Sequence, residues 1–110
     1  PLDNNVYSYE ENFRASLYCK HIFKTEKQAK SALAYAQLTQ LMALPEYNGD
    51  WVADWNVVCT TKYVIKRSNK SFFADEHSSI YEPISFKSKV IRNKFLENNR
   101  DLLKQYFGLD

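Results

Sequence analysis

Cys19 and His21 are the pair of side chains in this sequence with the types and spacing of a nucleophile and its base. They lie two residues apart in a stretch rich in strand-forming residues, so alternation places both side chains on the same face. A neighbouring histidine can activate a thiol for nucleophilic attack. No third residue that would orient the histidine can be identified, so the sequence gives thiol catalysis little support.

Carboxylate pairs and metal-ligand patterns are equally weak. Asp50 with Asp54, and Asp75 with Glu76, fall in segments that read as exposed turns, where a raised carboxyl pKa is not expected. Cysteines occur only at positions 19 and 59, without the paired spacing of a zinc site. Two glycines in the whole chain cannot build a phosphate-binding loop. We therefore predict no enzymatic activity, no metal and no cofactor.

The most distinctive segment is an aromatic and acidic turn. Trp51 and Trp55 lie four residues apart, each preceded by an aspartate, Asp50 and Asp54, and Tyr47 stands just before. Tryptophan has too much apolar area to leave both rings in water, so at least one should cover the end of a helix or a sheet edge. Exposed tryptophan and tyrosine are typical of interface centres. These five residues are the predicted protein-binding site.

A basic hairpin with interleaved aromatics is the competing feature. Between residues 62 and 94 there are eight basic and three acidic side chains. Such a ribbon can follow a phosphate backbone and stack bases, although lysines also serve to protect an edge hairpin from aggregation. The alternative nucleic-acid site comprises Lys62, Lys66, Arg67, Lys70, Phe72, Lys87, Lys89 and Arg92.

Length and composition favour one ordered domain. The chain has 110 residues, 45% of them hydrophobic, and a formal net charge of +2. The charge is −2 over residues 1–55 (five basic, seven acidic) and +4 over residues 56–110 (ten basic, six acidic), which is mild evidence for a basic face. No apolar run approaches the ~20 residues of a membrane span and no leader pattern opens the sequence. We expect a cytoplasmic protein whose cysteines act as small apolar side chains.

The elements begin after a polar lead-in at residues 1–14 and form a single domain over 15–110. Strand-forming residues predict a strand at 15–23. Thr25 and Gln28 form a capping box for a helix from Glu26 to about Ala43, which Pro45 follows.

The second half predicts a hairpin and a final helix. Strands are expected at 62–67 and 71–74 around an asparagine-containing turn, and at 84–86, with a short additional strand at 79–81. Ser88 should cap one helix that extends to Gly108. The predicted class is α+β in the order β-α-β-β-(β)-α, a small, mainly antiparallel sheet with two helices on one face.

Five short motifs define a resemblance that covers about residues 20 to 107. They are Phe23-Lys-Thr-Glu-x-x-Ala29, Tyr47-Asn-Gly-Asp-Trp51, Asp54-Trp55, Lys62-Tyr63-Val-Ile65 and Ser85-Phe86-Lys87-Ser88. In this order the chain resembles small uncharacterised proteins of phages, prophages and mobile elements. It departs from that pattern at 90–92, where acidic residues are commoner in the family. The resemblance implies a fold and a genomic context, and no activity.

The sequence thus predicts a small non-enzymatic binding protein that acts stoichiometrically on a protein partner, as an anti-defence inhibitor or an accessory factor would. The cytoplasm of a bacterial host is the expected location. Nucleic-acid binding through the hairpin 62–73 and the start of the last helix is the alternative. Edge strands and an aromatic-rich surface are also compatible with a homodimer.

Overall fold

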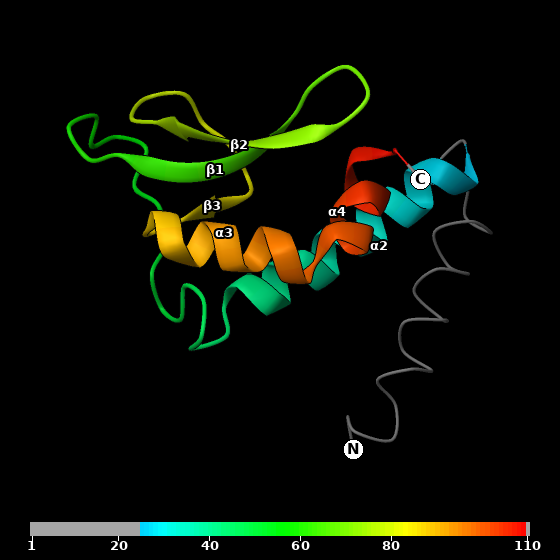
Figure 1. Ribbon diagram of the computed structural model, residues 1–110, viewed down its shortest axis with the longest axis horizontal. Coiled ribbons are helices and arrows are strands. Elements are labelled where there is room, and N and C mark those ends of the chain that lie inside the picture. The colour runs from blue at the N-terminus through cyan, green and yellow to red at the C-terminus, as the bar shows by residue number, and fades with distance from the viewer. Residues whose placement is uncertain (1–24, 110) are drawn as a thin grey trace.

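A computed structural model describes residues 25–109. The elements follow in the order α2 (Glu26–Met42), β1 (Lys62–Arg67), β2 (Phe72–His77), β3 (Ser85–Phe86), α3 (Lys89–Asn98) and α4 (Arg100–Phe107). The predicted lead-in at 1–14 and the predicted strand at 15–23 lie outside the described residues. In Figure 1 the helices α2, α3 and α4 lie on one side of the sheet.

The first helix begins and ends where the local chemistry predicts. The hydroxyl of Thr25 accepts a hydrogen bond of 3.1 Å from the backbone N–H of Gln28, which satisfies one of the free donors at the helix start. Alanine and leucine recur on its buried side, and Ala29, Ala34 and Leu38 are fully buried. The small alanine side chains allow the helix to approach α4 closely, and the Ser31 hydroxyl donates to the backbone carbonyl of Tyr106 there.

Over residues 25–109 the sheet has three antiparallel strands in the order β2-β1-β3. β1 and β2 form the predicted hairpin, with Lys62 opposite His77 and Arg67 opposite Phe72. The second strand is longer than the predicted 71–74. Residues 79–81 form no strand, so that prediction was wrong. The class, α+β with an antiparallel sheet, is confirmed.

The connection between β2 and β3 crosses the sheet. Both strands run antiparallel to β1 and flank it, so the connecting segment 78–84 must pass over β1. Lys62 and Val64 point to the same face by alternation, and Lys62 donates to the carbonyl of Ser78. The crossing therefore covers the face opposite the helices, which explains why Val64 is fully buried.

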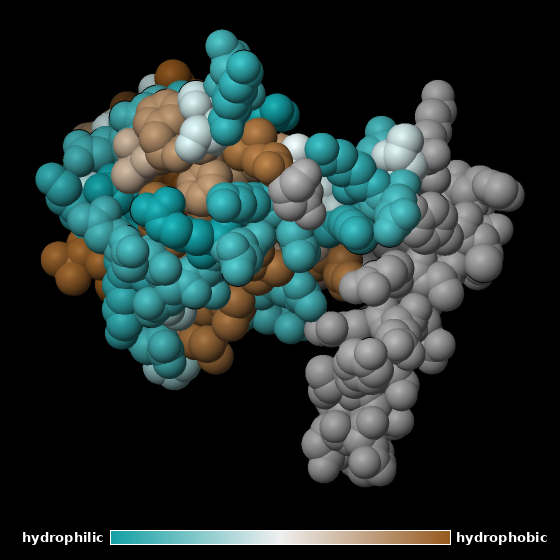
Figure 2. Space-filling view, turned by 45° about the vertical axis from the view of Figure 1, so that its right-hand side comes forward, coloured by the Kyte–Doolittle hydropathy of each residue, from teal (hydrophilic) through white to brown (hydrophobic). Residues whose placement is uncertain are grey.

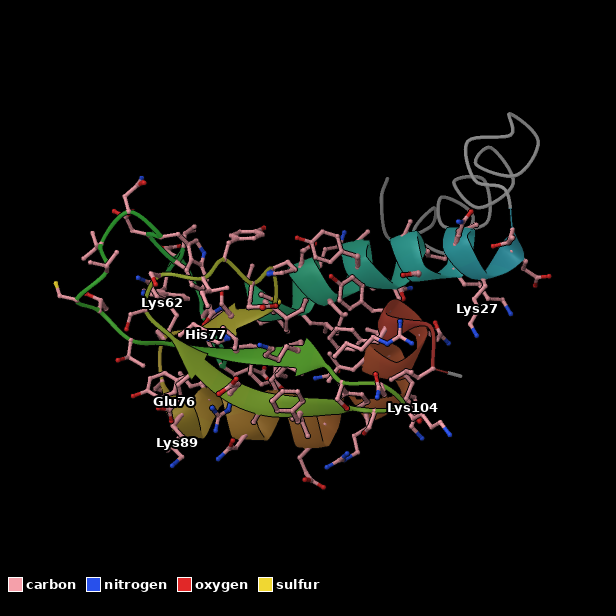
Figure 3. The ribbon with its side chains drawn as sticks, turned by 90° about the horizontal axis from the view of Figure 1, so that it is seen from above. Lys27, Lys62, Glu76, His77, Lys89 and Lys104 are labelled. Carbon is pink, nitrogen blue, oxygen red and sulfur yellow. The ribbon has the colours of Figure 1, made fainter. Side chains whose placement is uncertain are left out.

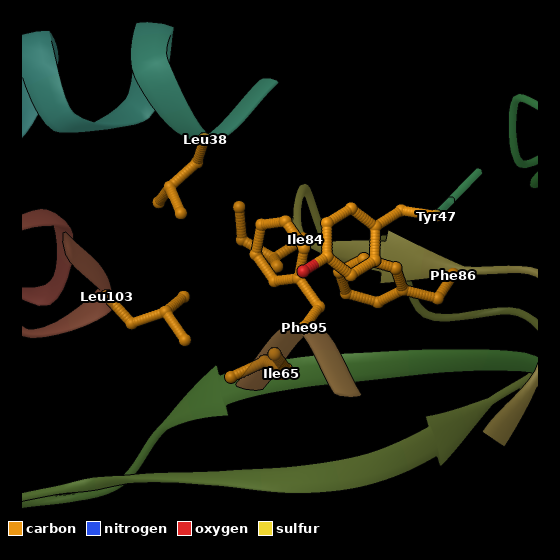
Figure 4. Packing of buried hydrophobic residues seen from close by; sticks show 7 residues of the cluster. All are labelled: Leu38, Tyr47, Ile65, Ile84, Phe86, Phe95 and Leu103. Carbon is orange, nitrogen blue, oxygen red and sulfur yellow. The ribbon is translucent and has the colours of Figure 1, made fainter. Parts of the chain in front are cut away.

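The core fills the space between the sheet and the helices. Figure 4 shows its side chains converging from α2, the sheet, α3 and α4. Phe95 is its centre, with ring centroids 4.8 Å from both Tyr47 and Phe86. Edge-to-face and tilted ring pairs of this kind are favourable beyond the area they bury. The cluster consists of Leu38, Tyr47, Ile65, Ile84, Phe86, Phe95 and Leu103.

The C-terminal helix is divided in two, which the sequence prediction missed. Ser88 caps α3 as predicted, accepting from the backbone N–H of Ile91 at 3.2 Å. The helix then breaks at Asn99, whose side chain donates to the carbonyl of Phe95 at 3.0 Å and so satisfies an acceptor at the helix end. α4 ends at Gly108 in the left-handed conformation (φ 71°), as the predicted stop requires.

Candidate binding pocket

The aromatic turn is anchored to the sheet through Asn48. Its side-chain nitrogen donates to the carbonyl of Ser85 at 2.9 Å, and its side-chain oxygen accepts from the N–H of Lys87 at 3.2 Å. The amide of Asn48 thereby occupies the free edge of β3 as a neighbouring strand would. Gly49 follows in the left-handed region (φ 56°), which turns the chain away from the sheet.

A buried lysine anchors the other end of the turn. Lys62 is only 1% exposed, and its ammonium group donates to the carbonyls of Val57 and Ser78, the latter at 3.0 Å. The same ammonium lies 5.2 Å from the centre of the Trp55 ring. Lys62 therefore holds together the aromatic segment and the crossing segment 78–84, because both supply it with acceptors.

A pocket of about 290 Å³ opens between these anchored segments. The end of α2, the aromatic turn and the crossing segment each provide one wall. Trp55 and Tyr81 meet edge to face across the last two of these, with ring centroids 5.7 Å apart. The lining residues are Thr39, Met42, Ala43, Asn48, Gly49, Trp51, Val52, Ala53, Trp55, Tyr81, Glu82, Pro83 and Ser85.

Large apolar side chains are exposed in the pocket lining and in the chain segments next to it. Val52 in the lining is 82% exposed and Tyr81 is 63% exposed. Of the eight large hydrophobic residues exposed among the described residues, six belong to the segments that frame the pocket. We call these six the apolar rim: Leu44, Val52, Val57, Val58, Ile80 and Tyr81. In Figure 2 apolar residues reach the surface in several places between hydrophilic ones.

The charge of the pocket segments is entirely acidic. Residues 31–61 and 78–86 contain no lysine or arginine, and their four carboxylates are Glu46, Asp50, Asp54 and Glu82. Since the whole chain is +2, the remaining residues carry +6. None of these four carboxylates forms an ion pair within residues 25–109. The buried ammonium of Lys62 lies 5.2 Å from the Trp55 ring and offsets one of these four charges. The pocket segments together with Lys62 therefore carry −3.

Two partly buried tyrosines outside the pocket lining form a stacked pair between α2 and α4. Tyr35 of α2 stacks on Tyr106 of α4, with ring centroids 5.3 Å apart. Burial raises the pKa of Tyr106 above its ordinary value of 10.0, and the negative charges of Tyr35, Tyr81 and Glu82 raise it further. Burial and Tyr81 likewise raise the pKa of Tyr35. The pocket rim and this stacked pair thus influence one another electrostatically.

The structure divides the predicted protein-binding residues into two groups. Trp51 and Trp55 line the pocket and are partly exposed, and Asp50 and Asp54 lie beside them on the surface. Tyr47 is only 4% exposed, packs on Phe95 and accepts from the side chain of Asn98 at 3.0 Å. As a surface contact residue, Tyr47 was predicted wrongly. The sequence reasoning missed Tyr81 and Val52 as pocket residues. Tyr81 was assigned to a strand at 79–81 that does not form, and Val52 stands between the two tryptophans without a chemical signal of its own.

The structure also separates the residues of the alternative, predicted nucleic-acid-binding site from one another. Lys62 and Arg92 were predicted to be accessible, but both are buried. Lys62 donates to the carbonyls of Val57 and Ser78. Arg92 donates to the carbonyl of Asp75, and its guanidinium lies over the Tyr63 ring. Lys66 lies 3.8 Å from the carboxylate of Asp75.

The accessible basic groups lie at opposite ends of the sheet. Arg67 and Lys70 are at the β1–β2 turn, whereas Lys87 and Lys89 are at the start of α3 (Figure 1). A six-residue strand separates them by about 20 Å. The ring of Phe72 is partly buried and stacks on Phe107, with ring centroids 5.7 Å apart. One face of the Phe72 ring is therefore covered and cannot stack on a nucleic-acid base.

Within residues 25–109, Lys66, Asp75 and His77 form a cluster on the hairpin, with the Lys66 ammonium 3.2 Å from His77 Nε2 and 3.8 Å from the Asp75 carboxylate. Figure 3 shows His77 and Lys62 at one end of the sheet, away from Lys104. Asp75 and Glu76 lie in β2 and not in the exposed turn that was predicted, and His77 of the same strand lies 3.6 Å from the carboxylate of Asp75. Cys59, which was expected to act as a small apolar side chain, is a free thiol exposed to solvent. Within residues 25–109 no group of three histidine, cysteine or acidic side chains could hold a metal ion. Cys19 and His21 lie outside the described residues.

No model of a protein family, no curated protein and no solved structure matches the chain. None of the helices described over residues 25–109 combines the length and the apolar character that crossing a bilayer requires.

Proposed function

We propose that this protein is a non-enzymatic binding protein that acts stoichiometrically on a protein partner through the pocket and its apolar rim. One observation carries the proposal: two tryptophans and Tyr81 stand at the surface of an open pocket whose walls are fixed by the buried residues Asn48 and Lys62. Aromatic residues dominate the binding energy of protein interfaces, and a fixed surface loses less conformational entropy on binding than a mobile one.

The apolar rim supports the same proposal. A group of exposed valines, Ile80 and Tyr81 costs solubility, and exposed apolar clusters of this kind mark interaction sites in soluble proteins. A phage or mobile-element origin and a bacterial cytoplasmic location belong to the proposal and depend on the sequence motifs alone. An inhibitor of a host defence protein and an accessory factor are both roles that such a surface would serve.

Affinity capture with one matched pair of variants tests the proposal. Val52→Lys puts a charge on the pocket rim, and Val90→Lys puts the same charge on α3, at a residue that is 77% exposed and lies outside the pocket lining. The free energy of unfolding of both variants should lie within about 0.5 kcal/mol of the wild-type value, because neither side chain is buried. From bacterial lysate, the wild type and Val90→Lys should retain a common partner in a complex of fixed stoichiometry, measured by light scattering. A partner retained equally by Val52→Lys would contradict the proposal.

A further inference from the structure

We propose that the pocket accepts a cationic side chain, an arginine, from a basic segment of the protein partner. This inference deepens the proposed function and depends on it, because it names what the partner must present. It follows from two independent features of the pocket, the aromatic rings in its walls and the sign of its charge.

The first feature is the set of aromatic faces. Trp51, Trp55 and Tyr81 all line the pocket. The negative face of an indole or phenol ring attracts cations, tryptophan most strongly. The interaction already occurs here, since the Lys62 ammonium lies 5.2 Å from the centre of the Trp55 ring. Arginine is the best occupant because its planar guanidinium stacks on such rings and is more weakly hydrated than an ammonium.

The second feature is the charge around the rings. Glu82 is the one charged side chain in the lining, and the flanking segments add Glu46, Asp50 and Asp54 without a single basic residue. Neither of the two lysines nearest to the lining belongs to it. Lys62 is buried and its ammonium is bound to the carbonyls of Val57 and Ser78, whereas the side chain of Lys87 is exposed. The carboxylate of Glu82 is unpaired within the described residues and so is available to a guanidinium.

Complementary charge selects the partner's surface. A basic segment would be attracted to the acidic pocket and repelled by the rest of the chain, which carries +6. An acidic or a purely apolar segment has no such preference for this face. The apolar rim then requires apolar side chains next to the arginine, so the fitting partner presents arginine flanked by leucine-like residues.

Tryptophan fluorescence of the purified full chain provides the test. Trp51 and Trp55 are the only tryptophans in the sequence and both line the pocket, so the emission reports on this site. The probes are three capped peptides of about ten residues in which leucine alternates with arginine, with citrulline or with glutamate. Citrulline keeps the planar shape of arginine and removes its charge.

The arginine peptide should shift the emission and saturate. The citrulline peptide should bind at least about tenfold more weakly, and the glutamate peptide should not bind, because the attraction depends on charge. Binding of the arginine peptide should weaken as salt rises. Glu82→Gln should lower the affinity for it about three- to tenfold. Glu76→Gln on β2, an exposed carboxylate outside the pocket lining (Figure 3), should leave it unchanged.

Charge reversal at Val52 keeps the test independent of folding. Val52 is 82% exposed, so Val52→Glu and Val52→Lys should both melt like the wild type. The arginine peptide should bind Val52→Glu more tightly than Val52→Lys, and the opposite order would overturn the inference. Equal affinity for arginine and citrulline peptides, or no response to the arginine peptide, would also overturn it.

Failure of this inference is distinguishable from failure of the proposed function. If Val52→Lys loses the captured partner while the peptides show no preference for charge, the pocket binds protein but not through a cation. If the emission changes with protein concentration alone and light scattering gives the mass of a dimer, a second copy of the chain occupies the pocket. Both results would overturn the arginine inference.

Discussion

Tyr47 and Trp55 are aromatic residues of the same irregular segment, yet they serve opposite purposes. Tyr47 is 4% exposed, packs on Phe95 and has its hydroxyl paired with Asn98. Trp55 is partly exposed and lines an open pocket beside Tyr81. Asn48 and Gly49 lie between the two and turn the chain from the core to the surface. The first part of the segment fixes its position, and the second part presents apolar area to solvent.

This difference indicates which substitutions should affect stability and which should affect binding. The core around Phe95 should tolerate little change, because interiors are packed to the density of organic crystals. The rim around Val52 should tolerate much, because water already surrounds it. Four predictions, in decreasing size of effect, test whether the two regions behave so differently.

The largest effect is expected in the core. Phe95→Ala should lower the free energy of unfolding by about 3–5 kcal/mol, since it removes a fully buried ring and leaves a cavity. Val52→Ala should change it by less than about 0.5 kcal/mol. Denaturant unfolding followed by circular dichroism measures both. Similar losses in the two variants would mean that the rim is part of the core.

The next effect concerns the anchor between the regions. Asn48→Ala should cost about 1–3 kcal/mol, because the carbonyl of Ser85 and the N–H of Lys87 each lose a buried partner. Asn56→Ala removes an exposed amide from the same segment and should stay within about 0.5 kcal/mol. A neutral Asn48→Ala variant would show that the aromatic segment folds without this anchor.

A smaller loss of stability is expected at the second anchor, with a larger local change. Lys62→Met keeps the apolar stem and removes the donor to the carbonyls of Val57 and Ser78. The free energy of unfolding should fall by about 1 kcal/mol. The tryptophan emission should change as well, because the cation leaves the Trp55 ring. Lys66→Met in the same strand should leave the emission unaltered. An unchanged emission of Lys62→Met would contradict the role of Lys62 in holding Trp55.

The smallest effect should appear only at high pH. The pKa of Tyr106 is raised in the folded state above 10.0, so the unfolded chain loses this proton first. The stability that Tyr106 contributes is therefore complete below pH 10 and is lost as the pH rises through its folded-state pKa. Between pH 9 and 11, the melting temperature of Tyr106→Phe should decrease less steeply with pH than that of the wild type. Parallel curves for the two proteins would contradict this assignment.

Local rules in the sequence account for most of the helix ends and the hairpin. Thr25, Ser88 and Gly108 act as predicted, because a cap depends on residues within one turn of the chain. The β1–β2 hairpin is equally local. The crossing of segment 78–84 over β1 is not, since it depends on which strands pair at long range, and no periodicity in the sequence encodes that choice.

The candidate site was only half predictable for the same reason. The two tryptophans were identified because their size and spacing are unusual. The burial of Tyr47, Lys62 and Arg92 depends on partners far away in sequence, such as Asn98 for the tyrosine and Ser78 for Lys62. A lysine is expected at the surface unless it is paired. Alternation places Lys62 on the same strand face as Val64, but the segment that covers this face is set by long-range strand pairing.

The central claim is that the partner binds at the pocket and not at the basic hairpin. Hydrogen exchange of the backbone amides, measured with and without the captured partner, tests this most directly. The account predicts that protection on binding concentrates at residues 49–59 and 78–85. Protection at the β1–β2 turn and residues 87–92, with the pocket segments exchanging as in the free protein, would contradict it.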